Sequence, residues 1–131
     1  MSRYVIRPDV ALSLAGGEVD VSNEHQLLAP TLLRSQLLSL QYQAVQRGEM
    51  TKKDADLQLD RVRGLRLRLL GDRVLQNVAW KVAEQLGWPD TFDAEYVALT
   101  QLQADALVTL DPRFGDAVRD VVTVVPLDAL S

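Results

Sequence analysis

Two aspartates stand where they could act together. Asp93 opens a segment whose apolar side chains recur at 92, 96, 99 and 102, a spacing typical of a helix. Asp111 closes a short apolar run, 106–110, that is typical of a buried strand. Functional groups of an open α/β sheet collect beyond the carboxyl ends of its strands. We therefore expect both carboxylates to face one crevice and to make it negative.

Each aspartate also has a purely structural explanation. An Asp in the first helical turn complements the helix dipole, and Asp90 or Thr91 can cap that turn. An Asp before Pro112 is ordinary turn chemistry. The residues alone leave both interpretations open, because inference of a site from residue types is probabilistic.

The elements that must position these residues alternate along the chain. We expect strands at 3–6, 26–29, 106–110 and 121–125, and helices at 8–15, 31–46, 52–63, 71–86, 91–99 and 113–119, with a polar link through Gln101 and Gln103. In the fourth of these helices we expect an apolar face of Val74, Val78, Val82 and Leu86, ended by Gly87. The alternation predicts an α/β, doubly wound parallel sheet of about four to five strands with helices on both faces.

Several segments in order resemble one known family. They are Tyr4–Leu12, Ala29–Ser39, Leu69–Arg73, Thr91–Leu99 and Leu107–Asp111, and together they extend over nearly the whole chain. This series resembles a PIN domain, specifically the small PIN-domain toxins of the VapC type. The resemblance implies a PIN-like fold, a role as the toxin of a toxin–antitoxin pair, and metal-dependent endoribonuclease chemistry.

Members of the resembled family bring about four carboxylates together around Mg²⁺ or Mn²⁺, whose bound water attacks an RNA phosphodiester. Asp93 and Asp111 match the third and fourth of these acids, as catalytic residues and metal ligands. Two positions depart from the pattern, because Arg7 and Gln36 stand where acids are expected. Arg113 also stands where many relatives carry a further acid, and Asp9 could lend a carboxylate instead.

The departures change the charge of the expected crevice. The crevice has a formal charge of −1 when Arg7, Asp93 and Asp111 are counted, and of −2 with Asp9. Four carboxylates would give it −4. A divalent cation would bind poorly there. We expect Arg7 to supply the positive charge that a metal supplies in relatives, by pairing with Asp93 and Asp111. RNA cleavage would then be impaired or lost. The expected cofactor is Mg²⁺ or Mn²⁺ if the protein is active, and none if it is not.

An arginine-rich stretch is the candidate partner surface. Leucines alternate with Arg66 and Arg68 over 65–69, which predicts leucines inward and arginines outward. With Arg61 and Arg63, these residues could follow an RNA backbone or hold an acidic segment of a cognate antitoxin. The alternative is a solvated face partly neutralised by neighbouring aspartates.

Composition limits the remaining choices. A chain of 131 residues with 47% hydrophobic residues is long enough for one core, and we expect a single domain over 1–131. Without cysteine there are no disulfides or thiolate metal sites, and one histidine, His25, cannot build a multi-histidine site; we expect His25 at a surface turn. We expect a cytoplasmic protein with no membrane span and, at a net charge of −4, no general binding of polyanions and no DNA contact by the chain itself.

Assembly and function are left as hypotheses. The apolar positions Leu37, Leu38, Leu40 and Tyr42 on one long helix predict a homodimer. Three functions remain: a metal-dependent endoribonuclease, a PIN-like domain that binds RNA or a protein without cleaving, and an unrelated α/β domain with a small-molecule site.

Overall fold

Five short strands form one parallel sheet in the computed structural model, which describes residues 1–131. The sheet order is β3-β2-β1-β4-β5, so the direction of winding reverses between β1 and β4. The strands are β1 (Ser2–Ile6), β2 (His25–Pro30), β3 (Leu67–Leu70), β4 (Ala106–Val108) and β5 (Val124–Val125). This sheet confirms the predicted α/β, doubly wound architecture.

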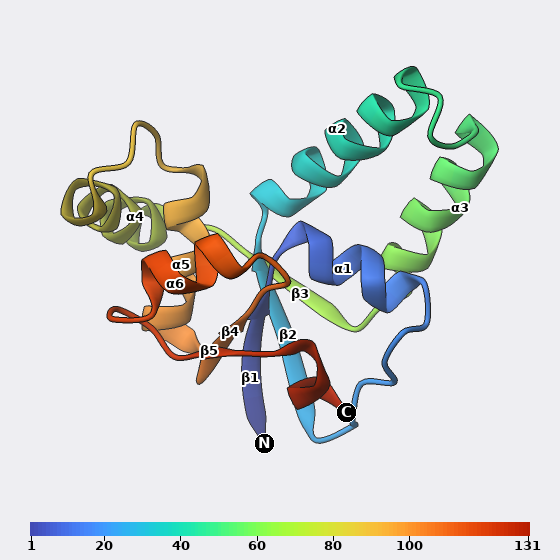
Figure 1. Cartoon of the computed structure of the whole chain (residues 1–131). Coiled ribbons are helices and arrows are strands. Elements are labelled where there is room, and N and C mark those ends of the chain that lie inside the picture. The colour runs from blue at the N-terminus through green and yellow to red at the C-terminus, as the bar shows by residue number, and fades with distance from the viewer.

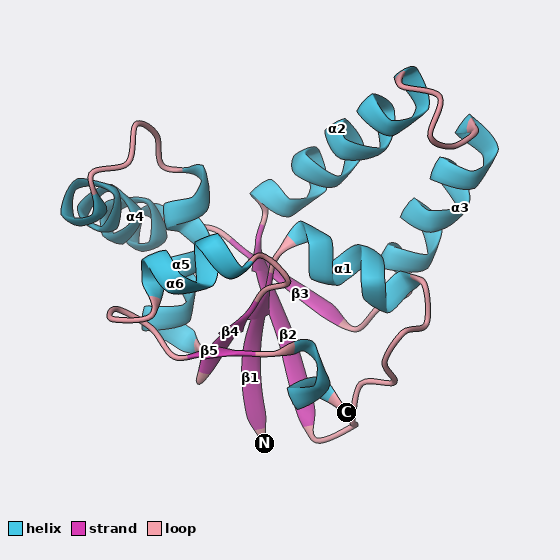
Figure 2. Ribbon diagram, in the orientation of Figure 1, coloured by secondary structure: helices cyan, strands magenta, loops and turns pink.

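Helices cover both faces of the sheet. They are α1 (Pro8–Ala15), α2 (Leu32–Gln46), α3 (Lys52–Arg63), α4 (Arg73–Leu86), α5 (Phe92–Gln103) and α6 (Pro112–Val118), followed by a short 3₁₀ turn at Leu127–Leu130. Figure 1 shows α1, α2 and α3 on one side and α4, α5 and α6 on the other. The same view coloured by element shows the sheet between these two layers (Figure 2). None of the helices is long and apolar enough to cross a membrane.

Local signals explain why several helices begin and end where they do. Thr51 and Asp72 cap α3 and α4 by accepting hydrogen bonds from the backbone N–H groups of Asp54 and Leu75. Gly87 ends α4 with φ of 69°, a left-handed conformation that glycine adopts without steric cost. Because Asp72 is the cap, α4 begins at Arg73 and not at the predicted position 71.

The core lies where β1, β2 and β4 meet α5. Val5 and Ile6 of β1, Leu28 of β2 and Leu107 of β4 are almost fully buried. Such a continuous apolar content is typical of parallel strands that are covered on both faces. Tyr96 of α5 is also completely buried against this sheet.

Some boundary predictions were wrong. β3 was not predicted as a strand, and the last strand is shorter than 121–125, since the N–H groups of Val121 and Val122 turn back to the carbonyl of Val118. The helix α5 continues through the segment predicted to be a polar link, to Gln103.

Two predicted apolar faces also need correction. Of the face predicted for α4, Val82 is buried and Val78 and Leu86 pack against the core, but Val74 is 56% exposed. The helix buries Leu75, Ala79 and Ala83 beside Val82, so its apolar face is rotated from the predicted one. Leu37 was predicted to be an exposed dimer residue, but it is only 4% exposed, since α3 packs against α2 and covers that side.

Candidate functional site

The candidate site lies at the carboxyl ends of β1 and β4, where the winding of the sheet reverses. The register places Ile6 beside Val108, so Arg7 and the Thr109–Asp111 segment leave the sheet side by side. This is the region in which open α/β sheets bind ligands. The hollow there has a volume of about 360 Å³ and is lined by Arg7, Pro8, Asp9, Gln36, Ser39, Leu40, Gln43 and Asp111.

Arg7 is the central charged group of the site. Its Nη1 lies 3.0 Å from Oδ1 of Asp93, and its side chain is 15% exposed whereas that of Asp93 is 47% exposed. The guanidinium carbon lies 3.6 Å from the ring centre of Phe114 and 5.5 Å from that of Tyr96. The Trp88 ring in turn stacks on the Phe114 ring, with ring centres 6.1 Å apart. The guanidinium is therefore held by a carboxylate and by aromatic faces at once.

The Nε atom of Arg7 is buried and has no hydrogen-bond partner. An unpaired buried donor normally costs free energy, so the stacking and the ion pair must offset this cost. The position of Arg7 is thus fixed by several neighbours and not by one.

Gln36 enters the site from α2 and meets α5. Its Oε1 accepts a hydrogen bond of 2.6 Å from the hydroxyl of Tyr96. Burial raises the pKa of the Tyr96 hydroxyl above its ordinary value, so this hydroxyl stays protonated and donates. Position 36, where the resembled family would carry an acid, is therefore occupied by a glutamine that accepts a hydrogen bond from Tyr96.

Asp111 does not pair with Arg7, which corrects the prediction that it would. Its Oδ1 instead accepts hydrogen bonds from the backbone N–H groups of Arg113 and Phe114, so that it caps α6 with Pro112 at the first helical position. The contacts of Asp111 are therefore structural, but they form a helix cap and not the simple turn that Asp111-Pro112 suggested. The cap also orients Phe114, the residue on which Arg7 stacks.

Asp9 is similarly engaged with the backbone. Its two carboxylate oxygens accept hydrogen bonds from the N–H of Val10 at 2.7 Å and from the N–H of Leu110 at 3.2 Å. It ties the start of α1 to the chain that follows β4. Asp9, Asp93 and Asp111 thus each have a partner within the protein.

The residues present do not fit a resident Mg²⁺ or Mn²⁺. No three carboxylate, histidine or cysteine side chains converge so that they could hold a metal ion. A divalent cation at this place would have to compete with the Arg7 guanidinium for Asp93. The charged groups that the site does bring together are the Arg7 guanidinium and the Asp93 carboxylate.

The other predicted residues lie outside the hollow. Arg61, Arg66 and Arg68 are exposed, and Arg63 pairs with Asp60 on α3. Arg113 is exposed at the start of α6. Contrary to the prediction of a surface turn, His25 begins β2 and packs edge-on against Tyr4, with ring centres 5.0 Å apart.

Sequence reasoning missed the aromatic residues of the site. Phe114 and Trp88 lie 107 and 81 positions beyond Arg7 in the chain, and nothing local marks them as its neighbours. Tyr96 carried a weak signal, because it follows Asp93 by three positions and therefore shares a helix face with it.

Comparison with known proteins adds evidence on the fold. No protein-family model and no curated protein matches the sequence. Among solved structures, the chain is similar to PAE2754 from Pyrobaculum aerophilum, with a TM-score of 0.73 and 17% identity over 98% of this chain and 93% of that one. It is also similar to VapBC2 from Rickettsia felis, solved bound to a DNA fragment from their promoter, with a TM-score of 0.64 and 13% identity over 95% and 98% of the two chains.

These similarities extend over almost the whole of each chain. Together with the five-stranded parallel sheet, they confirm the predicted α/β, PIN-like fold. Identities of 13% and 17% establish the fold, whereas function depends on the residues of the site.

Proposed function

We propose that this protein is a PIN-like domain of the toxin type in which metal-dependent cleavage of RNA is impaired or lost, and which acts by binding a cognate antitoxin protein or RNA. The observation that carries the proposal is the Arg7 guanidinium, 3.0 Å from Asp93 and stacked on Phe114. In this proposal the positive charge of Arg7 takes over the role of the cation that the resembled family uses for hydrolysis.

The engagement of the other acids supports the same proposal. Asp111 caps α6, and Asp9 binds two backbone N–H groups, so neither presents a free pair of oxygens to a cation. Gln36 carries no charge and accepts from Tyr96. The site lacks the accumulation of negative charge that draws a divalent ion and lowers the pKa of its water.

A partner-binding role is supported by what the chain leaves exposed. Arg61, Arg66 and Arg68 form no ion pair within the chain, although its net charge is −4. Such a local basic surface suits an acidic protein segment or a phosphate backbone. The similarity to VapBC2 makes an antitoxin the natural candidate partner. Given the net charge of −4, we expect no DNA contact from this chain itself.

RNA cleavage tests the proposal. The purified protein is incubated with single-stranded RNA in Mg²⁺ and in Mn²⁺, beside an Asp93→Ala variant prepared identically. We expect the two preparations to give the same background rate, because Asp93 serves Arg7 and not a metal. Metal-dependent cleavage that disappears in Asp93→Ala would overturn the proposal and would mean that Asp93 acts as a ligand despite Arg7.

A further inference from the structure

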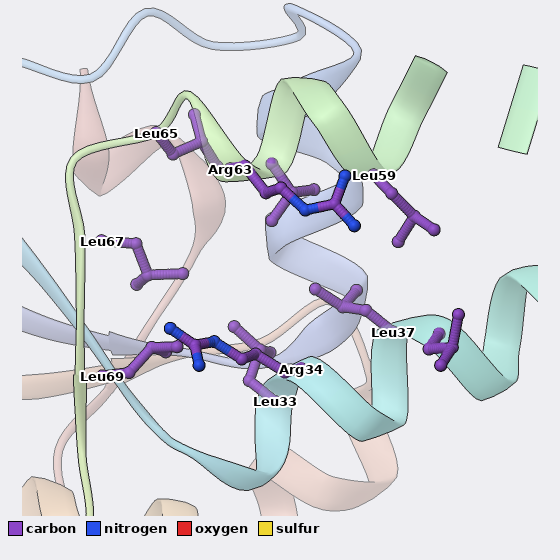
Figure 3. A pocket seen from close by; sticks show the side chains of 10 residues that line it. Leu33, Arg34, Leu37, Leu59, Arg63, Leu65, Leu67 and Leu69 are labelled. Atoms are coloured by element: carbon purple, nitrogen blue, oxygen red, sulfur yellow. The ribbon is translucent and has the colours of Figure 1, made fainter. Parts of the chain in front are cut away.

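A second hollow lies between α2, α3 and the edge strand β3. Its volume is about 540 Å³, and eight of its ten lining residues are hydrophobic. Side chains from three elements form it: Leu33 and Leu37 of α2, Leu59 and Val62 of α3, and Leu67 and Leu69 of β3. Figure 3 shows the leucines of β3 directed from the strand into this space, with Arg34 and Arg63 at its border.

The strand beside the hollow has a free edge. β3 is the first strand of the sheet order and pairs only with β2, in the register Leu67 with Leu27 and Leu69 with Ala29. No other strand pairs with its outer side. A free edge presents unpaired backbone N–H and C=O groups, which can receive a further strand.

The two faces of β3 differ in chemistry. Leu67 and Leu69 line the apolar hollow, whereas Arg66 and Arg68 alternate with them, are exposed and pair with no carboxylate of the chain. A strand added at this edge would place every second side chain beside the leucines and the others beside the arginines. The surface therefore favours an occupant in which apolar and acidic residues alternate.

The surroundings of the hollow agree with an acidic occupant. Arg34 is the only charged residue of α2 and forms no ion pair. Asp60, the acid nearest along the chain to the border, is already paired with Arg63. No unpaired carboxylate lines the hollow to repel an acidic segment.

A second copy of this chain fits the edge poorly. Antiparallel pairing of β3 with another β3, in the register that sets Leu67 opposite Leu67, would bring Arg66 of each copy opposite Arg68 of the other. Like charges directly opposite each other destabilise a strand pair. The arginines thus oppose self-pairing while leaving the edge open to an acidic partner, which is how native edge strands avoid aggregation.

We infer that β3 is a docking edge for an extended segment of another protein, a segment in which apolar and acidic residues alternate, with its apolar side chains seated in the hollow between α2 and α3. Backbone hydrogen bonds to β3 would supply affinity, and the hollow and arginines would supply specificity. The inference deepens the proposed partner-binding function and rests on it, but its test involves neither a metal nor the Arg7 site, so the two can fail separately.

Peptide binding tests the inference. The probe is a short capped peptide in which Leu and Glu alternate, and its isomer has the same composition with the leucines at helical spacing. Binding to the full chain is measured by fluorescence anisotropy, and hydrogen exchange of the backbone amides locates it. We expect the alternating peptide to bind and to protect β3, whereas the helical isomer binds at least tenfold more weakly.

N-methylation separates strand pairing from other modes. Successive amides of a strand point to opposite edges, so methylating all Leu amides and methylating all Glu amides should have opposite results. One set should abolish binding, and the other should be tolerated. Failure of the alternating peptide to bind, or equal effects of the two methylations, would overturn the inference.

Charge variants complete the test. Arg66→Glu with Arg68→Glu should weaken binding of the alternating peptide about tenfold. The matched control, Lys53→Glu with Lys81→Glu, makes the same change of net charge at exposed positions away from β3 and should leave binding within twofold. Equal losses in the two variants would overturn the inference, since they would indicate long-range attraction and no defined edge.

Discussion

Removing Asp93 from its ion pair with Arg7 should cost more stability than removing Arg7, and a double-mutant cycle measures the difference. The Arg7 side chain is 15% exposed, whereas that of Asp93 is 47% exposed. Asp93→Asn leaves a mostly buried guanidinium without its counter-charge. Arg7→Met leaves a carboxylate that water can still reach, and the methionine can remain on the Phe114 face. We therefore expect the aspartate variant to be the more destabilised.

The magnitude follows from the burial of the pair. Hydrogen bonds to charged groups contribute about 1.5–3 kcal/mol, and exposed ion pairs about 0–1 kcal/mol. With one partner largely buried and the other half-exposed, we expect Asp93→Asn to lower the free energy of unfolding by about 1–2 kcal/mol. Arg7→Met should cost less than about 1 kcal/mol.

Urea unfolding followed by tryptophan fluorescence measures the four proteins, and Trp88 reports on the site because it stacks on Phe114. Once Arg7 is methionine, Asp93→Asn should cost almost nothing, which gives a coupling energy of about 1–2 kcal/mol. An Asp93→Asn cost that is the same in both backgrounds would refute the reasoning, because the aspartate would then stabilise the protein through something other than Arg7.

Three further predictions concern other parts of the molecule. Burial raises the pKa of the Tyr96 hydroxyl, so as the pH rises past about 10 the unfolded chain loses this proton before the folded chain does. The free energy of unfolding should therefore fall above that pH, and less steeply in Tyr96→Phe. Equal dependence of this free energy on pH in the two proteins, measured by alkaline urea titrations, would contradict the prediction. Leu38 and Tyr42 are 62% and 64% exposed on α2, so we expect light scattering to give the mass of a dimer. The double variant Leu38→Glu with Tyr42→Glu should give the monomer mass of 14.6 kDa. A wild type that is monomeric at high micromolar concentration would rule out the dimer. If Arg66 and Arg68 serve a protein strand, replacing both with Ala should leave the salt dependence of RNA binding unchanged, whereas a slope reduced by about 1.4, or about 0.7 per phosphate, would assign them to RNA.

Local signals in the sequence predicted most of the helices. The bounds of α3 agree with the predicted 52–63, since Thr51 caps it and Gly64 follows it. The alternation over 65–69 predicted leucines inward and arginines outward, but β3 itself was not assigned as a strand, because it has only four residues and none of them is fully buried. Leu37 was misplaced because periodicity identifies an apolar side chain without saying which neighbouring helix will cover it.

The candidate site was predictable in position but not in its contacts. The strand-end argument located Asp111 and Asp93, and the resemblance added Arg7 and the expectation that it would pair with Asp93. The sequence Asp111-Pro112 also carried a helix-start signal, which would have indicated the cap in place of an ion pair. The stacking of Arg7 on Phe114 joins residues 107 positions apart, and only the tertiary fold brings them together.

The most direct test of the central claim, that Arg7 stands in for a metal ion, is the melting temperature in Mn²⁺ of the wild type and of Arg7→Asp with Gln36→Glu. The wild type should not respond to Mn²⁺. The double variant should melt lower without metal, since its carboxylates repel one another, and should gain about 2.7 kcal/mol of stability at a Mn²⁺ concentration 100 times its Kd. A wild type stabilised by Mn²⁺, or a double variant indifferent to it, would contradict the account.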